Sequence, residues 1–276
     1  MSATRQLLGT FNGMPTSDGA GVSLLRVVGT PQIDYLDPFL MLDEFKNEDP
    51  GAYVAGFPEH PHRGFETVSY MKQGCMRHRD SAGNEGIIKD GGVQWMTAGS
   101  GIIHSEMPEQ TEGLLWGYQL WVNLPAEHKM TKPRYQDIQS EGIPEVETDD
   151  LKVRIMAGDY QGQQGASQTI WPVEYMDVMA KGGTVFDHDI PDGHNVMIFV
   201  YEGSLEIDGQ EIGVHQLGIF GQEGRLSVKA SAKGAGFLMM AGKPINEPVA
   251  KLGPFVMNNE AELRQAVMDF RAGRFA

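Results

Sequence analysis

The chain has 276 residues, with a hydrophobic content of 41% and a charged content of 21%, values typical of a folded globular protein long enough for two domains. A formal net charge of −15, with Lys and Arg scattered singly, argues against the basic face on which direct nucleic-acid binding depends. No apolar run approaches the ~20 residues that cross a bilayer, and the first residues lack a signal-peptide core. The single cysteine, Cys75, cannot form an internal disulfide. We therefore expect a monomeric cytoplasmic protein with no membrane contact.

Short apolar segments separated by glycine-rich turns fill the first half of the chain. Residues 1–20 are polar and are predicted to be a loosely held start. The segments predicted to be strands are 22–28, 66–71, 93–96, 102–107 and 114–124. Strands spaced about 8–12 residues apart, without helical periodicity between them, indicate an all-β antiparallel sandwich or barrel.

A change in composition divides the chain near its middle. Residues 125–150 are rich in proline and acids and are predicted to connect two domains. A second strand-rich region follows, with segments 152–157, 173–180, 195–201, 204–207, 217–220, 225–229 and 236–241. The tail from residue 259 predicts a short helix, with Asn258 or Asn259 as its N-cap and Gly273 after its end.

The stretch from Phe57 to Glu106 carries the candidate chemistry. It contains His60-Pro61-His62 near its start and His104-Ser105-Glu106 at its end. Because side chains alternate faces along an extended segment, His60 and His62 project the same way, and so do His104 and Glu106. Two such pairs on facing strands would bring three imidazoles and a carboxylate to one point. The spacing therefore predicts a metal site.

The donor types limit the metal but leave the carboxylate open. Three imidazoles and one carboxylate suit a divalent first-row ion such as Fe, Mn, Ni, Cu, Co or Zn. Glu66 competes with Glu106 for the carboxylate role, and the other of the two would support the ligands from behind, as Arg63 could by screening a carboxylate. The histidines of the second half, at 188, 194 and 215, have no ligand-like spacing.

Other aromatic and histidine residues are interpreted as structural. Trp95, Trp116 and Trp121 are expected in the core, and His78 and His128 on the surface.

Long motifs resemble the pirin family of the cupin superfamily. They are HPHRGFETVSY at 60–70, QWMTAGSGIIHSEMP at 94–108, LWVNL at 120–124, DPF at 37–39, DEF at 43–45 and GPFVMN at 253–258. The resemblance implies two tandem cupin β-barrels, a metal-binding one at 1–135 and a metal-free one at 136–276 that ends in the short helix. It also implies one iron ion, expected as Fe(II), held by His60, His62, His104 and Glu106.

The activity that this resemblance implies is less uniform. Some pirin-like proteins are similar to quercetin 2,3-dioxygenases, which would make a flavonol and O₂ the substrates, Glu106 the general base, and carbon monoxide a product. Phe57, Met71, Met96 and Met107 are the candidate apolar walls for the flat rings. The alternative is a non-catalytic, redox-responsive binding protein, a transcriptional cofactor or a modulator of a metabolic enzyme, whose acidic surface suits a basic partner.

Overall fold

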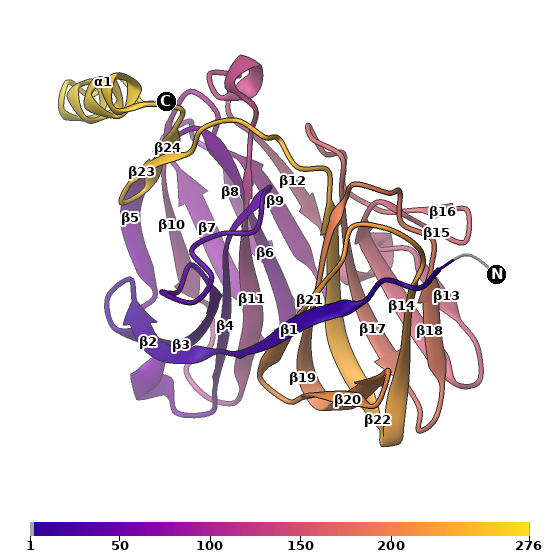
Figure 1. Ribbon diagram of the computed structural model, residues 1–276. Helices are drawn as coiled ribbons and strands as arrows, with labels where there is room; N and C mark the ends of the chain where they lie inside the picture. Colours follow the sequence, from indigo (N-terminus) through magenta and orange to yellow (C-terminus); the bar gives the residue numbers. More distant parts are fainter. Residues whose placement is uncertain (1–2, 276) are drawn as a thin grey trace. The chain divides into compact units, whose positions relative to one another are not determined.

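The computed structural model describes residues 3–275, and antiparallel sheets dominate it (Figure 1). Two compact units divide the chain. The first barrel is made of residues 14–140 and 245–275, and the second barrel of residues 3–13 and 141–244. The crossing at 140/141 is near the predicted boundary at 135/136, but each end of the chain belongs to the unit that is built mainly from the other half. No helix among the described residues is long and apolar enough to cross a membrane.

A seven-stranded sheet and a four-stranded sheet form the first barrel. In spatial order, the larger sheet consists of β12 (Arg134–Ile138), β9 (Val93–Thr97), β6 (Phe65–Gln73), β11 (Leu115–Asn123), β4 (Phe39–Asn47), β3 (Val22–Val28) and β2 (Met14–Asp18). The smaller consists of β5 (Phe57–His62), β10 (Ile102–Pro108), β7 (Met76–Asp80) and β8 (Glu85–Ile88). One core cluster joins them, with Phe45 and Met71 from the larger sheet against Met76 and Ile88 from the smaller.

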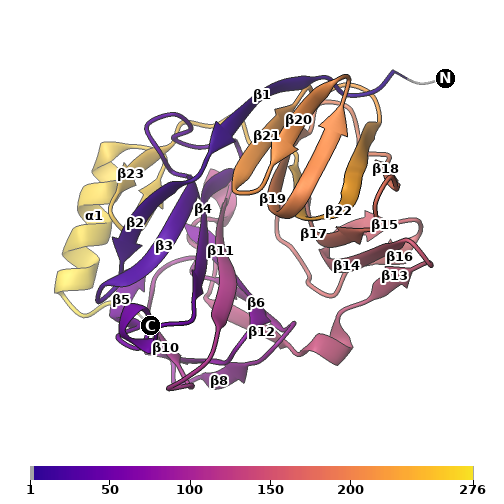
Figure 2. The ribbon, with the colours of Figure 1, turned by 90° about the horizontal axis from the view of Figure 1, so that it is seen from below.

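The C-terminal segment completes the first barrel. The hairpin of β23 (Ala250–Leu252) and β24 (Phe255–Met257) packs against α1 (Glu260–Arg271) (Figure 2). Asn259 caps α1 by accepting a hydrogen bond from the backbone N–H of Glu262, so the predicted N-cap is correct. The helix begins there because the cap satisfies an amide that has no partner within the helix.

A buried lysine ties this segment to the strands that carry the candidate ligands. Lys129 is 1% exposed, and its ammonium donates to the carbonyl oxygens of Gly64 and Val256, at 2.8 and 3.0 Å, and to Asn123 Oδ1 at 2.6 Å. Gly64 has a φ of +90°, and a Cβ there would lie 1.9 Å from the Val256 carbonyl oxygen. Only glycine lets the two backbones approach this closely.

The second barrel is a nine-stranded sheet with its own core. The main path consists of β1 (Leu7–Asn12), β21 (Gln216–Phe220), β19 (Asn195–Ile207), β22 (Leu226–Gly242), β17 (Val173–Ala180), β14 (Leu151–Ala157) and β13 (Glu145–Glu147). Paired off this path are β18 (Val185–His188) and β20 (Gln210–Gly213), and a separate hairpin is formed by β15 (Asp159–Tyr160) and β16 (Gln163–Gln164). Three short 3-10 turns, η1 (Pro50–Ala52), η2 (Ala126–His128) and η3 (Ser140–Gly142), complete the elements.

Two sequence predictions about these strands are wrong. Residues 7–12 and 14–18 form β1 and β2 and are not a loose start. β19 and β22 are long single strands where shorter pairs were predicted, because Gly203 and its neighbours make register shifts inside the pairing of β19 with β22 and not a turn.

Candidate metal centre

Strands β5 and β10 bring three of the predicted ligands together. The two strands pair antiparallel, with His60 opposite His104 and His62 opposite Ile102. The imidazoles of His60, His62 and His104 each offer a ligand atom, and these atoms all lie within 4.8 Å of one another. It is the one such group found among residues 3–275. Strand alternation explains the arrangement, since His60 and His62 share a face and a cross-strand neighbour faces the same way.

The hydrogen-bonding state of these rings suits a metal ion. His60 Nδ1 lies 2.8 Å from the Pro58 carbonyl oxygen, which can only accept, so Nδ1 carries a proton and Nε2 is the nitrogen that can bind an ion. That Nε2 lies 3.0 Å from His62 Nε2. His104 is 1% exposed, and neither of its ring nitrogens has a hydrogen-bond partner among the described residues. Buried lone pairs without partners are costly unless something binds them.

Burial also keeps these rings in the ligand form. Desolvation holds the pKa of His62 and of His104 well below the usual value, and the neighbouring imidazoles add to the effect by repelling a second positive charge. Both rings are therefore neutral at physiological pH, which is the state that binds metals. The donor set and its environment fit a divalent transition-metal ion.

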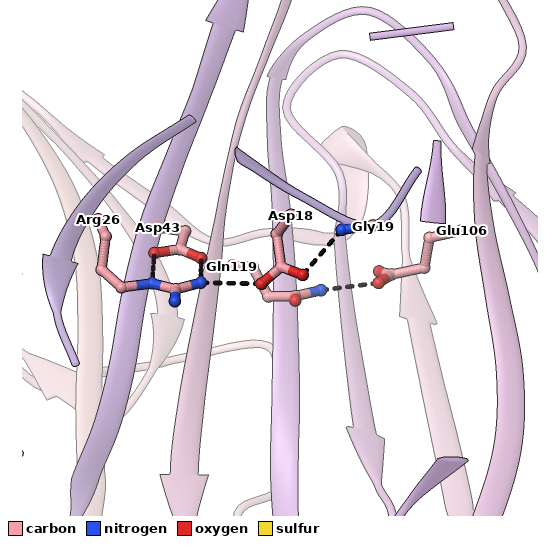
Figure 3. Close-up of polar contacts among 6 residues, drawn as sticks. All are labelled: Asp18, Gly19, Arg26, Asp43, Glu106 and Gln119. Atoms are coloured by element: carbon pink, nitrogen blue, oxygen red, sulfur yellow. Dashed lines mark hydrogen bonds and ion pairs between the residues drawn. The ribbon is translucent and has the colours of Figure 1, made fainter. Parts of the chain in front are cut away.

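Glu106 lies beside the histidine group but is held by other side chains. It is 3% exposed. Ser69 donates to its Oε1 at 2.6 Å, and Gln119 Nε2 donates to its Oε2 at 2.7 Å (Figure 3). The close group of ligand atoms contains the three imidazoles without this carboxylate. A bulge between His104 and Glu106 shifts the pairing, so that Glu106 stands opposite Phe57. The carboxylate is thus fixed by two donors from the larger sheet.

The other predicted supporting residues point elsewhere. Glu66 lies three positions before Ser69 on β6, so its side chain is on the opposite face of that strand. There its Oε1 accepts a hydrogen bond from Thr97 Oγ1 at 2.6 Å, and burial raises the pKa of Glu66. Arg63 follows His62 directly, but its guanidinium donates to the Ser100 carbonyl oxygen and to Asp269 of α1, both at 2.7 Å.

A cavity of about 670 Å³ opens beside the histidines. Of the four predicted wall residues, Phe57 lines it, together with Trp121, which was predicted to be core. Met71 and Met96 are buried in the hydrophobic clusters of the barrel, and Met107 is a half-buried residue of β10 that does not line the cavity. The ring of Trp121 lies 5.2 Å from that of His62, nearly perpendicular to it.

The structure pairs two further histidines with carboxylates. His78 was predicted to be a surface residue, but it is 1% exposed, and its Nε2 lies 2.8 Å from Asp137 Oδ2. In the second barrel, His188 pairs with Glu174.

Sequence reasoning missed Gln119 and Ser69, the partners of Glu106. Both lie on the inward face of the larger sheet, opposite each other on β11 and β6. Alternation along each strand shows which other residues share a face with them. What was missing is the strand order, which places β6 and β11 across the barrel from β10.

Comparison with known proteins agrees with this geometry. A family model described as Pirin matches residues 21–122, and one described as the Pirin C-terminal cupin domain matches residues 175–276. A Pseudomonas aeruginosa protein, provisionally named quercetin 2,3-dioxygenase, is 50% identical over the full length of both chains. Human Pirin is 41% identical, covering 92% of this chain and 88% of its own. The crystal structure titled quercetin 2,3-dioxygenase from Acinetobacter baumannii superposes with a TM-score of 0.93 at 34% identity, covering 99% of each chain. This chain, with its two cupin barrels, belongs to the pirin family.

Proposed function

We propose that this pirin-family chain is an iron-dependent dioxygenase that opens the central ring of a flavonol with O₂ and releases carbon monoxide. The observation that carries the proposal is a cluster of three imidazoles, two of which line a cavity of about 670 Å³ with aromatic walls. The activity named in the A. baumannii structure and in the P. aeruginosa relative supports the substrate class.

His60, His62, His104 and Glu106 would hold the ion. Fe(II) is the proposed metal, and Mn, Ni, Co, Cu and Zn are alternatives for the same donor set. When bound, the ion supplies Lewis acidity to the flavonol 3-oxygen and makes the reaction with O₂ accessible.

The side chains of the site provide binding and proton transfer. Glu106 accepts the proton of the 3-hydroxyl group, while Ser69 and Gln119 hold its carboxylate in place. Phe57 and Trp121 contact the flat rings and exclude water. One oxygen atom of O₂ then enters the new ester carbonyl and the other the new carboxyl group. The carbon that carried the 3-hydroxyl leaves with its oxygen as carbon monoxide, and Glu106 returns its proton to the carboxyl group.

Protein loaded with iron under anaerobic conditions should consume quercetin when O₂ is admitted, with one carbon monoxide released per flavonol. Glu106→Gln should keep the cavity but lose the turnover, and His62→Ala should lose stoichiometric metal binding. His128→Ala, at a half-exposed histidine outside the site, is the control and should behave as the native protein. Absence of flavonol consumption with every first-row metal named above would reject the dioxygenase.

One contact favours a second candidate function, a binding protein whose surface responds to the charge of the metal. Arg63 follows the candidate ligand His62 and bonds Asp269 of α1, so a shift at the ligand could reach the helix. Amide hydrogen exchange in α1, compared between Fe(II) and Fe(III) protein, tests this candidate, and identical exchange in the two states counts against it.

A further inference from the structure

A row of polar side chains crosses the inner face of the larger sheet of the first barrel. Arg26 on β3 stands opposite Asp43 on β4, Asp43 opposite Gln119 on β11, and Gln119 opposite Ser69 on β6. The row ends at Glu106, which Gln119 contacts (Figure 3) and to which Ser69 also donates. Arg26, Asp43 and Gln119 all line the cavity that His60 and His62 line.

The far end of the row offers a donor beside an acceptor. Arg26 donates to the buried Asp43 through Nε and Nη2, at 2.9 and 2.7 Å, and its Nη2 also donates to Asp18 at 2.9 Å. Its Nη1 makes no hydrogen bond with any residue in the described range 3–275. The Asp43 side chain is 5% exposed and that of Asp18 is 55% exposed. The buried Asp43 is thus the internal counterion of Arg26, whereas the exposed Asp18 can also accept a hydrogen bond from a ligand.

The hairpin that carries Asp18 is held in place. The backbone N–H of Gly19 donates to Asp18 Oδ1 at 2.8 Å, and that of Ala20 donates to the Gly56 carbonyl oxygen at 3.0 Å. Gly19 has a φ of +60°, and a Cβ there would lie 2.6 Å from both that oxygen and the ring of Phe57. The position of the acceptor relative to Arg26 is therefore defined by the backbone and does not depend on a free loop.

The length of this row and the charges that line the cavity indicate which kind of ligand fits. Arg26 lies two strand spacings from Gln119, roughly 10 Å, a distance on the scale of a three-ring aromatic molecule. Trp121 and Met41 lie on one side of the row, and Phe45 and Leu24 on the other. The charged side chains that line the cavity are the acids Asp18, Asp34, Asp43 and Glu59 and the bases Arg26 and Lys251. With acids in excess, a neutral hydroxyl group is favoured there over an anionic one.

We propose that Arg26 and Asp18 recognise hydroxyl groups at the end of the aromatic ligand remote from the metal. Arg26 Nη1 donates to one hydroxyl oxygen, and the Asp18 carboxylate accepts from a neighbouring hydroxyl. An adjacent donor and acceptor match a vicinal pair of phenolic hydroxyls, as in a catechol ring. This inference rests on the proposed function for the identity of the ligand, and it assigns to these two residues the choice among flavonols.

Three flavonols that differ only in the remote ring test the assignment. Quercetin carries two hydroxyls there, kaempferol one and galangin none. Their dissociation constants are measured without O₂ on the metal-loaded full chain by quenching of tryptophan fluorescence. The native protein should bind quercetin about tenfold more tightly than galangin, the size expected for hydrogen bonds to charged groups. Arg26→Met and Asp18→Ala each remove one of the two hydrogen bonds and should each lower that ratio to about threefold, while galangin affinity stays unchanged.

A control variant and an independent test variant keep the result interpretable. Arg79→Met removes an arginine whose side chain is 65% exposed and which bonds Glu85 outside the cavity, and it should keep the native ratio. Because Arg26→Met strands the buried Asp43, Asp18→Ala provides the answer if that variant does not fold. Equal weakening of all three flavonols, or an unchanged ratio in Asp18→Ala, would overturn the assignment.

The assignment and the dioxygenase can fail separately. Selective binding without turnover would reject the dioxygenase and keep the recognition of hydroxyls. Turnover without selectivity among the three flavonols would do the reverse.

Discussion

Replacing Gln119 with leucine should weaken metal binding although Gln119 is not a ligand. The amide of Gln119 donates to Glu106 Oε2 at 2.7 Å, and a carboxylate can only accept, so the amide orientation is fixed. Leucine keeps the approximate volume and removes this donor, and Ser69 still holds Oε1. Loss of one such supporting bond typically lowers metal affinity 10- to 100-fold. With the serine retained we expect about tenfold, or about 1.4 kcal/mol.

Competition with a chromophoric chelator measures that affinity, and the visible spectrum of the cobalt-substituted protein reports the coordination of the ion. A shift of the cobalt bands should accompany the loss of affinity, because the carboxylate is no longer fixed. Gln94→Leu is the matched control, since Gln94 is a buried glutamine that donates to Asp137 at 2.9 Å instead. Native affinity and spectrum in Gln119→Leu, or the same losses in Gln94→Leu, would refute the role given to Gln119.

Two further predictions concern the C-terminal segment. Burial lowers the pKa of Lys129 from 10.5 to about 8, so between these pH values the unfolded chain binds more protons than the folded one. The free energy of unfolding of the metal-free native protein should therefore rise over pH 8–10.5, by up to about 1.4 kcal/mol per pH unit. The melting temperature should rise with it, and Lys129→Met should lack this rise. Identical pH profiles would contradict this. The Arg63 guanidinium lowers the pKa of Asp269 from 3.8 to about 2, so the Arg63–Asp269 ion pair is intact above the higher value and is lost as pH falls through the lower. Asp269→Asn should accelerate amide exchange throughout α1 at pH 7, measured by mass spectrometry, whereas Arg264→Gln, at an exposed ion pair of the same helix, should not.

Sequence patterns predicted which side chains share a face of one strand. They did not predict the contacts between residues of different sheets. Alternation alone placed His60 and His62 on one face, and the structure brings them to His104. Glu66 and Glu106 could not be separated from residues alone, because the face that Glu66 occupies depends on which side of β6 the barrel interior lies. The partner of Glu106, Gln119, comes from a strand of the opposite sheet, so no spacing in the sequence could identify it. His78 lies between two arginines in the sequence and was therefore predicted on the surface, yet it is buried and contacts Asp137 of β12.

The exchange of chain ends between the two units sets the order in which the site can form. The histidines and Glu106 occur before residue 107, but Gly253 and Pro254 line the same cavity, and the Val256 carbonyl oxygen shares the Lys129 ammonium with Gly64. During synthesis these candidate ligands therefore emerge long before the segment that completes the cavity wall. The candidate site therefore lacks part of its cavity wall until residues 141–252 have been synthesised. A fragment that ends between the two strand-rich halves would therefore lack Gly253 and Pro254 from the wall of the cavity.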